Sequence, residues 1–233
     1  MKVAVIIPAA GAGKRLPGKI AKQYLEIHGK PVINWTVNRF LSMDIISKGI
    51  LVVPQDEVDR TWQLFSDDQN FKKKFDIIIG GNHRQDSVFN GLAQLNDTMD
   101  LVLVHDGVRP LVSREIIMES IRVAGESGAC IVAVPVKDTV KRVQENHVLE
   151  TIPREQVWQV QTPQTFRYEI LYHAHQQARQ MKYYATDEAA LLEWLGIPIA
   201  VIRGDYRNIK ITTREDMIIA EALWAEALWN DRS

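Results

Sequence analysis

Cysteine is almost absent from this sequence. Its 233 residues include a single one, Cys130, so the chain cannot form an internal disulfide. A chain without disulfides fits a reducing compartment, and the cytoplasm is therefore the predicted location. Cys130 lies in the apolar run GACIVAVPV, which predicts a small core residue rather than a nucleophile.

Long apolar runs and an excess of charge are also missing. No stretch approaches the roughly 18 consecutive apolar residues of a membrane-spanning helix. Lys and Arg number 28 against 29 Asp and Glu, a formal net charge of -1. This balance argues against bulk attraction to nucleic acid or to an anionic membrane, although it leaves room for a local basic pocket. Neither nucleic acid nor a membrane is therefore a predicted partner.

The glycine-rich stretch IIPAAGAGKRL, residues 6–16, lacks both common phosphate-loop signatures. Leu16 stands where the dinucleotide fingerprint needs its third glycine. The Walker A pattern fails because Pro8 replaces its first glycine and Arg15 its Ser or Thr. A loop of small residues followed by Lys14 and Arg15 can still bring backbone amides close to an anion. A solvated basic loop is the alternative interpretation.

Apolar runs rich in β-branched residues alternate with amphipathic segments along most of the chain. The predicted strands are 3–7, 49–53, 75–79, 101–105, 129–134 and 197–202. The predicted helices are 31–43, 56–66, 85–96, 113–127, 167–181 and a last one that opens with a capping box of Thr213 and Asp216. This alternation predicts an α/β fold with a mostly parallel sheet, in one domain spanning 1–233.

Residues 136–152 interrupt the alternation. Valines recur there among charged residues, and the turn-prone QENH lies in the middle, which predicts a projecting β-hairpin within an arm at about 136–158. A two-stranded hairpin is marginal in water, so it needs a surface to pack against. Either the main sheet or a second subunit would supply one.

Four further stretches carry candidate chemistry near predicted strand ends: GGNHRQDS (80–87), VHDGVRP (104–110), TPQTF (162–166) and NIKITT (208–213). Beside a triphosphate, Asp106 would be a hard oxygen ligand for Mg²⁺. Each stretch also has a structural explanation, with His105 as a satisfied core histidine, Thr162 as a turn residue and Lys210 as a solvated edge charge. Their occurrence together favours a site.

Taken in order, these stretches resemble the 2-C-methyl-D-erythritol 4-phosphate cytidylyltransferases of the non-mevalonate isoprenoid pathway. The resemblance runs nearly end to end through PAAGAGKRL, KQYL, GGNHRQDSV, VHDGVRP, VPVKDTVK, TPQTF, TDEAALLEWLG and NIKITTRED. It implies a Rossmann-like nucleotidyltransferase domain whose β-arm interlocks a homodimer, which would explain the hairpin. It also implies CTP and a sugar-alcohol phosphate as the bound partners.

The resemblance also implies roles for individual residues. Arg15 and Lys22 would stabilise charge on the transferring phosphate, Arg154 and Lys210 would hold the attacking phosphate, and Asp106 would bind magnesium. The CTP-binding positions are Ala9, Ala10, Gly11, Gly13, Gly81, Asn82, Ser87 and Asp106. The acceptor-binding positions are Thr139, Arg154, Thr162, Lys210 and Arg109, with Thr139 and Arg154 offered by the partner subunit's arm.

The implied reaction transfers CMP from CTP to 2-C-methyl-D-erythritol 4-phosphate, giving 4-diphosphocytidyl-2-C-methyl-D-erythritol and pyrophosphate. Val108 stands where this family commonly has Ala, and the related ribitol 5-phosphate cytidylyltransferases often carry Val there. Ribitol 5-phosphate or another polyol phosphate is therefore an alternative acceptor. A CTP sensor without catalysis is an alternative from another class, because a fold alone does not specify an activity.

Overall fold

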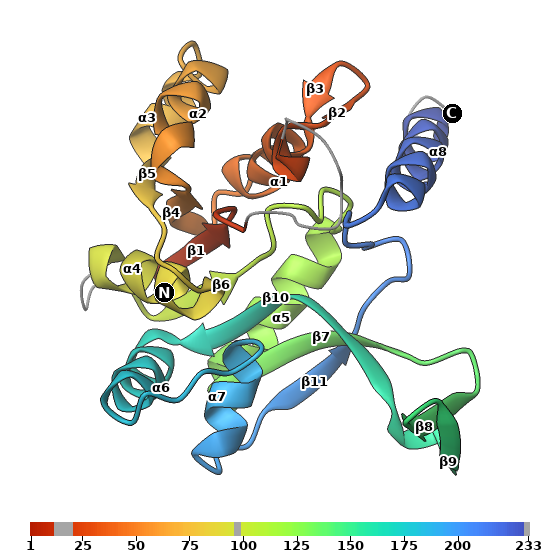
Figure 1. Ribbon diagram of the computed structural model, residues 1–233. Helices are drawn as coiled ribbons and strands as arrows, with labels where there is room; N and C mark the ends of the chain where they lie inside the picture. Colours follow the sequence, from red (N-terminus) through yellow and green to blue (C-terminus); the bar gives the residue numbers. More distant parts are fainter. Residues whose placement is uncertain (12–20, 96–98, 231–233) are drawn as a thin grey trace.

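A computed structural model describes residues 1–11, 21–95 and 99–230 of the chain. Its centre is a seven-stranded sheet with the strand order β11-β7-β10-β6-β1-β4-β5 (Figure 1). The strands are β1 (Val3–Pro8), β4 (Ile46–Val53), β5 (Phe75–Ile79), β6 (Leu101–Val104), β7 (Ala129–Pro135), β10 (Trp158–Arg167) and β11 (Ala200–Arg203).

The sheet is parallel except for β10, as the alternation of apolar strands and helices predicts. β1 pairs in parallel with β4 on one side and with β6 on the other, so that Val5 faces Gly49 and Leu103. β10 runs antiparallel between β6 and β7. The carboxyl ends of β1, β4, β5 and β6 therefore meet at one edge of the sheet, where open α/β folds place their ligands.

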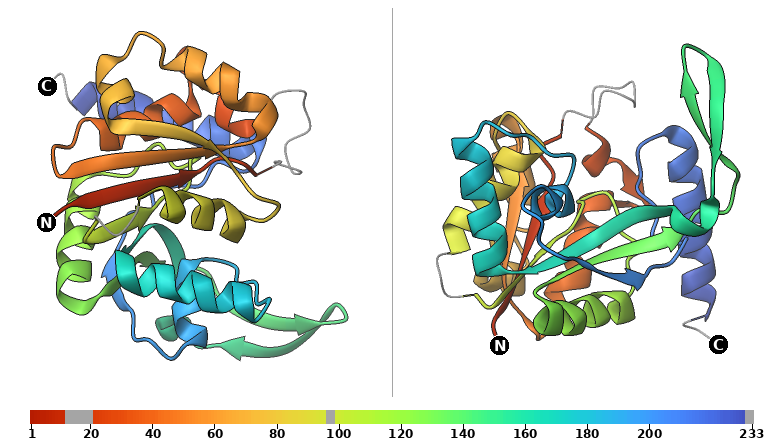
Figure 2. Two further views of the ribbon diagram at one scale, coloured as in Figure 1. Left: turned by 90° about the vertical axis from the view of Figure 1, so that its left-hand side faces the viewer. Right: turned by 90° about the horizontal axis from the view of Figure 1, so that it is seen from below.

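Helices cover both faces of the sheet (Figure 2). They are α1 (Val32–Leu41), α2 (Val58–Leu64), α3 (Gln69–Lys74), α4 (Arg84–Leu95), α5 (Arg114–Ser127), α6 (Tyr168–Gln180), α7 (Glu188–Trp194) and α8 (Arg214–Asn230). Short 3-10 helices occupy Lys22–Tyr24, Gln55–Glu57 and Arg154–Gln156.

Alternation along β1 separates two hydrophobic cores. Val5 and Ile7 point to the core that α1, α3 and α5 cover, whereas Ala4 and Ile6 point to the core that α4, α6 and α7 cover. Cys130 is buried in the first core and is a free thiol. Burial raises the pKa of its thiol to about 12, which confirms the prediction of an inert core residue.

One central strand was not predicted. β10 contains the polar, proline-bearing sequence WQVQTPQTFR, which does not read as a buried strand. Its polar side chains instead form hydrogen bonds with residues that are distant in sequence. Gln161 donates to the Asp205 carbonyl, and Gln164 donates to the Asp187 carboxylate. The short helices α3 and α7 were not predicted either.

The predicted hairpin is present. β8 (Val140–Gln144) and β9 (His147–Ile152) form a separate two-stranded antiparallel sheet that projects from the body (Figures 1 and 2). Glu145 and Asn146 join them with positive φ angles of 48° and 63°, as a type I′ turn requires. A second two-stranded sheet, β2 (Glu26–Ile27) with β3 (Lys30–Pro31), precedes α1.

The predicted capping box begins α8. Asp216 accepts hydrogen bonds from the Thr212 and Thr213 amides at 2.8 Å, and its own amide donates to the Thr213 hydroxyl. Trp224 of α8 packs against Trp35 of α1, with ring centroids 4.3 Å apart. Ile211, next to Lys210, is buried in the same cluster and donates its amide to the Val108 carbonyl at 2.9 Å, which holds the segment before α8 at the sheet edge.

Candidate active site

A cavity of about 230 Å³ opens at the carboxyl edge of the sheet, among the loops that follow β1, β5 and β6. Its lining comes from segments far apart in the sequence. The lining residues are Pro8, Ala9, Ala10, Gly11, Lys22, Gln23, Gly81, Asn82, His83, Arg84, Ser87, Asp106, Val108 and Lys210.

Most residues implied by the resemblance meet in this cavity. They are Ala9, Ala10, Gly11, Lys22, Gly81, Asn82, Ser87, Asp106 and Lys210. Gly13 and Arg15 lie outside the described residues. The cavity therefore unites the glycine-rich loop after β1 with the later stretches that also suggested a site.

Small residues let the loops after β1 and β5 approach each other. A Cβ at Gly80 would come within 2.5 Å of the Ala10 Cβ and 2.8 Å of the Ser87 hydroxyl, so a larger residue would push the two loops apart. A Cβ at Gly11 would meet none of the described atoms within 4 Å. Gln23 is buried and donates to the Ala9 carbonyl at 2.8 Å, which fixes the first loop from behind.

Asp106 is a buried carboxylate in the lining of the site, and three cations surround it. Lys210 Nζ lies 2.9 Å and Arg109 Nε 3.3 Å from Oδ2, while Arg84 Nε lies 3.7 Å from Oδ1. Burial alone would raise the pKa of Asp106, but Lys210, Arg84 and Arg109 together hold it well below its usual range. Asp106 is therefore ionised at neutral pH.

His105 and Thr162 form a hydrogen-bond network behind Asp106. Burial lowers the pKa of His105 to about 4, so the ring is neutral at pH 7. One ring nitrogen contacts the Arg109 carbonyl and the other the Thr162 hydroxyl, each at 3.1 Å. The same hydroxyl accepts the Asp106 amide at 3.0 Å. His105 is thus a satisfied core histidine, and Thr162 holds the backbone of Asp106.

Arg109 and the arm residues lie outside the lining of the cavity. Arg109 is buried behind Asp106 and donates to the Asn208 carbonyl at 2.7 Å. Thr139 is exposed at the base of the arm. Arg154 is also exposed, and it donates to the Lys137 carbonyl at 3.1 Å. Within one subunit these two arm residues are not brought to the cavity.

Arg84 and Glu188 belong to the site but were not predicted individually. Arg84 lines the cavity, and its Nη1 donates to both carboxylate oxygens of the buried Glu188, at 2.7 and 2.8 Å. Both residues lie in stretches that carry the resemblance. In sequence, however, Glu188 resembles an ordinary acidic residue in the first turn of a helix. Only the tertiary contact shows that Glu188 pairs with a residue of the cavity.

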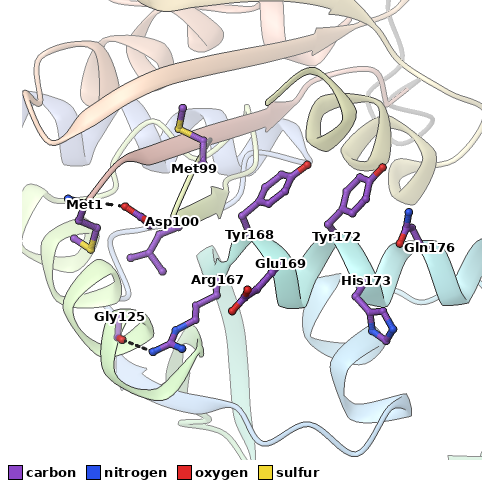
Figure 3. A pocket seen from close by; sticks show the side chains of 11 residues that line it. Met1, Met99, Asp100, Gly125, Arg167, Tyr168, Glu169, Tyr172, His173 and Gln176 are labelled. Atoms are coloured by element: carbon purple, nitrogen blue, oxygen red, sulfur yellow. Dashed lines mark hydrogen bonds and ion pairs between the residues drawn. The ribbon is translucent and has the colours of Figure 1, made fainter. Parts of the chain in front are cut away.

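A larger hollow of about 860 Å³ lies at the opposite edge of the sheet, beside the amino ends of β1 and β6 (Figure 3). Two contacts join residues of its lining. The amino terminus of Met1 lies 3.9 Å from Asp100 Oδ2, and Arg167 donates to the Gly125 carbonyl at 3.1 Å. No glycine loop or cation cluster faces it among the residues that the structure describes. The smaller cavity is therefore the candidate site.

Glycine-rich loops, a carboxylate and several cations at the switch edge of an α/β sheet define a nucleotidyltransferase-like domain. Comparison with known proteins specifies the class. The chain matches the family described as 2-C-methyl-D-erythritol 4-phosphate cytidylyltransferase over residues 3–226.

Relatives named for the same enzyme match almost the whole chain. The protein of Alkaliphilus oremlandii is 46% identical over 223 residues, 95% of this chain and 94% of its own. That of Halalkalibacterium halodurans is 44% identical over 226 residues, 97% of this chain and 98% of its own.

Solved structures named for this enzyme are similar to the chain in fold and in sequence. The 4-diphosphocytidyl-2C-methyl-D-erythritol synthase of Anaerococcus prevotii is 32% identical, with a TM-score of 0.85 over 96% of both chains. The cytidylyltransferase of Thermus thermophilus is also 32% identical, with a TM-score of 0.78 over 96% of this chain and 98% of its own.

This chain belongs to the 2-C-methyl-D-erythritol 4-phosphate cytidylyltransferase family. It is an enzyme that converts CTP and 2-C-methyl-D-erythritol 4-phosphate to 4-diphosphocytidyl-2-C-methyl-D-erythritol. The ribitol phosphate alternative and the sensor alternative receive no support from these relatives. In the described part of the chain, none of the helices combines the length and hydrophobicity that a membrane crossing requires.

Proposed function

We propose that the cavity at the carboxyl edge of the sheet is where this enzyme aligns CTP with its acceptor. The observation that carries the proposal is the meeting, in one cavity, of cytidylyltransferase motif residues from widely separated segments. Small residues there leave backbone amides accessible to the nucleotide. The residues proposed to hold the CTP are Ala9, Ala10, Gly11, Gly13, Gly81, Asn82, Ser87 and Asp106.

The chemistry is an in-line displacement at the α-phosphorus of CTP. A phosphate oxygen of the acceptor forms the new P–O bond, and the bond to pyrophosphate breaks. The protein needs no nucleophile for this step, so it acts by positioning two polyanions and by balancing the negative charge that develops. We assign the charge-balancing role to Lys22, which lines the cavity, and to Arg15.

Asp106 is the proposed ligand for a divalent cation. Among the described residues, no group of three or more His, Cys, Asp or Glu could hold a metal without help. One carboxylate nevertheless suits Mg²⁺, which is usually bound through one or two carboxylates together with phosphate oxygens of the substrate. Bound there, Mg²⁺ would neutralise negative charge on the phosphates of CTP.

The acceptor phosphate is assigned to the side of Asp106 on which Lys210 lies. Lys210 reaches the cavity, and Thr162 and Arg109 support this side from behind. Thr139 and Arg154 are too exposed within one subunit to complete this region alone. We propose that a second copy supplies them through its arm, which makes the enzyme a homodimer.

The cytoplasm is the proposed location. This assignment rests on a single, buried cysteine in a chain without disulfides, as expected in a reducing compartment.

Pyrophosphate release from CTP and Mg²⁺ tests the proposed function. The purified protein is given 2-C-methyl-D-erythritol 4-phosphate or ribitol 5-phosphate in separate reactions. Release with the first alone is the expected result. Release with the second alone would overturn the acceptor, and CTP binding without release in either reaction would favour a sensor.

A further inference from the structure

Arg84 can affect two parts of the proposed CTP site, the loop of Gly81 and Asn82 and the carboxylate of Asp106. It is the first residue of α4, two positions after Asn82. One edge of its guanidinium group donates to both oxygens of Glu188, and its Nε lies 3.7 Å from Asp106 Oδ1. A single side chain thus links α4, α7 and the end of β6.

Glu188 limits where that guanidinium group can point. Its side chain is 1% exposed. Its amide donates to Gln164 Oε1, so the backbone of α7 is also tied to the central strand β10. A buried carboxylate deprived of its cation is strongly unfavourable. The arrangement therefore keeps the Nη1 group of Arg84 on Glu188 and leaves only the Nε edge facing Asp106.

Asp106 is held from two sides as a result. Lys210 and Arg109 lie beside Oδ2, whereas Arg84 lies beside Oδ1 at a distance longer than a hydrogen bond. The negative charge of Glu188 offsets the positive charge of Arg84. Without Glu188, that positive charge would act on Asp106 uncompensated and would compete with any other cation.

We propose that Arg84 and Glu188 are positioning residues for Asp106, with Glu188 acting through Arg84. The pair sets the orientation of the Asp106 carboxylate and keeps it available to the divalent cation that accompanies CTP. This inference rests on the proposed function, because it assumes that Asp106 is the metal ligand of the cytidylyl transfer.

Metal binding in Glu188→Gln tests the proposal without relying on turnover. The variant keeps the shape of the side chain and removes its charge. Mn²⁺ serves as the probe, and its binding to the protein with CTP is followed by water-proton relaxation. Apparent Mn²⁺ affinity is expected to fall at least about tenfold, as is usual when a group supporting a metal ligand is lost.

Glu193→Gln is the matched control. Glu193 lies on the same helix and is exposed, so the same chemical change there is expected to leave Mn²⁺ affinity unchanged. Wild-type Mn²⁺ affinity in Glu188→Gln, together with a lowered Tm, would mean that the pair is only structural and would overturn the proposal.

Arg84→Lys keeps the test decisive if Glu188→Gln does not fold. Lysine retains a charge beside Glu188 but loses the second edge that faces Asp106. This variant is expected to fold and to bind Mn²⁺ several-fold more weakly. Unchanged Mn²⁺ affinity in Arg84→Lys would also overturn the proposal.

A double-mutant cycle tests whether Glu188 acts through Arg84. The combined variant of Arg84→Gln and Glu188→Gln is expected to bind Mn²⁺ no more weakly than the worse single variant. Additive losses would refute action through Arg84.

Failure of the proposed function would be seen in a different measurement. If wild-type protein binds Mn²⁺ with CTP but forms no product from 2-C-methyl-D-erythritol 4-phosphate, the proposed function fails, whereas the Mn²⁺-binding results for the variants still decide the role of Arg84 and Glu188.

Discussion

His105 and Asp106 are neighbours at the end of β6, yet their surroundings give them opposite charge behaviour. His105 is enclosed, and its ring nitrogens contact the Arg109 carbonyl and the Thr162 hydroxyl, so it is neutral at pH 7. Asp106 faces three cations and remains ionised. Burial and the nearby cations both keep the histidine neutral, whereas the same cations offset the burial of the aspartate and keep it ionised.

Lys22→Ala is expected to lower kcat by about 10²–10³-fold while weakening CTP binding far less. The reason is that its charge is needed most where negative charge develops in the transition state. Steady-state kinetics gives kcat, and calorimetric titration gives CTP affinity. Exposed Lys73→Ala on α3 is the matched control and is expected to change neither. Equal losses of affinity and turnover in Lys22→Ala would contradict the assignment.

His175 on α6 is a second buried histidine, and neither of its ring nitrogens has a hydrogen-bond partner among the described residues. Burial lowers the pKa of His175 to about 3 from an ordinary value of 6.5. Between these values the unfolded chain binds a proton that the folded chain does not. The contribution of His175 to stability is therefore complete above pH 6.5 and is lost progressively as the pH falls toward 3.

His175→Met is expected to flatten this pH dependence. Between pH 7 and pH 5, the free energy of unfolding should fall by about 2 kcal/mol less in the variant than in wild type. It should also stabilise the protein at pH 7 by about 1 kcal/mol, because two unsatisfied nitrogens are removed. Urea unfolding at both pH values measures this, and an unchanged slope with pH would show that His175 does not titrate as described.

The elements differ in how well the sequence predicts them. Continuous apolar runs predicted the buried strands β1, β4, β6 and β7, because a strand buried on both faces needs no polar side chains. Apolar runs also predicted the edge strands β5 and β11, although these are partly exposed. β10 escaped prediction because Gln161 and Gln164 are satisfied by Asp205 and Asp187, which are distant in sequence. The same limit applies to the site. Local motifs predicted most of the cavity lining, but the contact between Arg84 and Glu188 exists only after folding.

The arm offers a prediction about a single element. Glu145 and Asn146 both have positive φ angles, and Asn-Gly is the preferred pair for such a turn. Combining Glu145→Asn with Asn146→Gly is expected to stabilise the hairpin by about 1 kcal/mol, since left-handed backbone is unfavourable for most residues. Hydrogen exchange of β8 and β9 amides should slow by about fivefold.

Asn146→Ala provides the opposing control. Alanine tolerates a positive φ angle less well than asparagine, so the same amides should exchange faster. If all variants exchange at the same rate, the turn does not limit the stability of the arm.

The arm leaves the molecule with a surface that one subunit does not cover. β8 and β9 pair only with each other in the described structure. Val143, Val148 and Leu149 expose more than half of their side chains there, at 55%, 62% and 56%. The proposed exchange of arms between two copies would cover this apolar surface. Replacing Val148 and Leu149 with Lys is then expected to shift sedimentation toward monomer.

Mixing two inactive variants tests whether the arm serves the neighbouring subunit. In a heterodimer of Lys22→Ala and Arg154→Ala, one site would combine an intact Lys22 with an intact Arg154 from the other chain. Random reassortment of equal amounts makes half the dimers mixed, so about a quarter of wild-type activity is expected. If Arg154 served its own subunit, both sites of the mixed dimer would be defective. The mixture would then be no more active than the separate variants, and the shared site would be refuted.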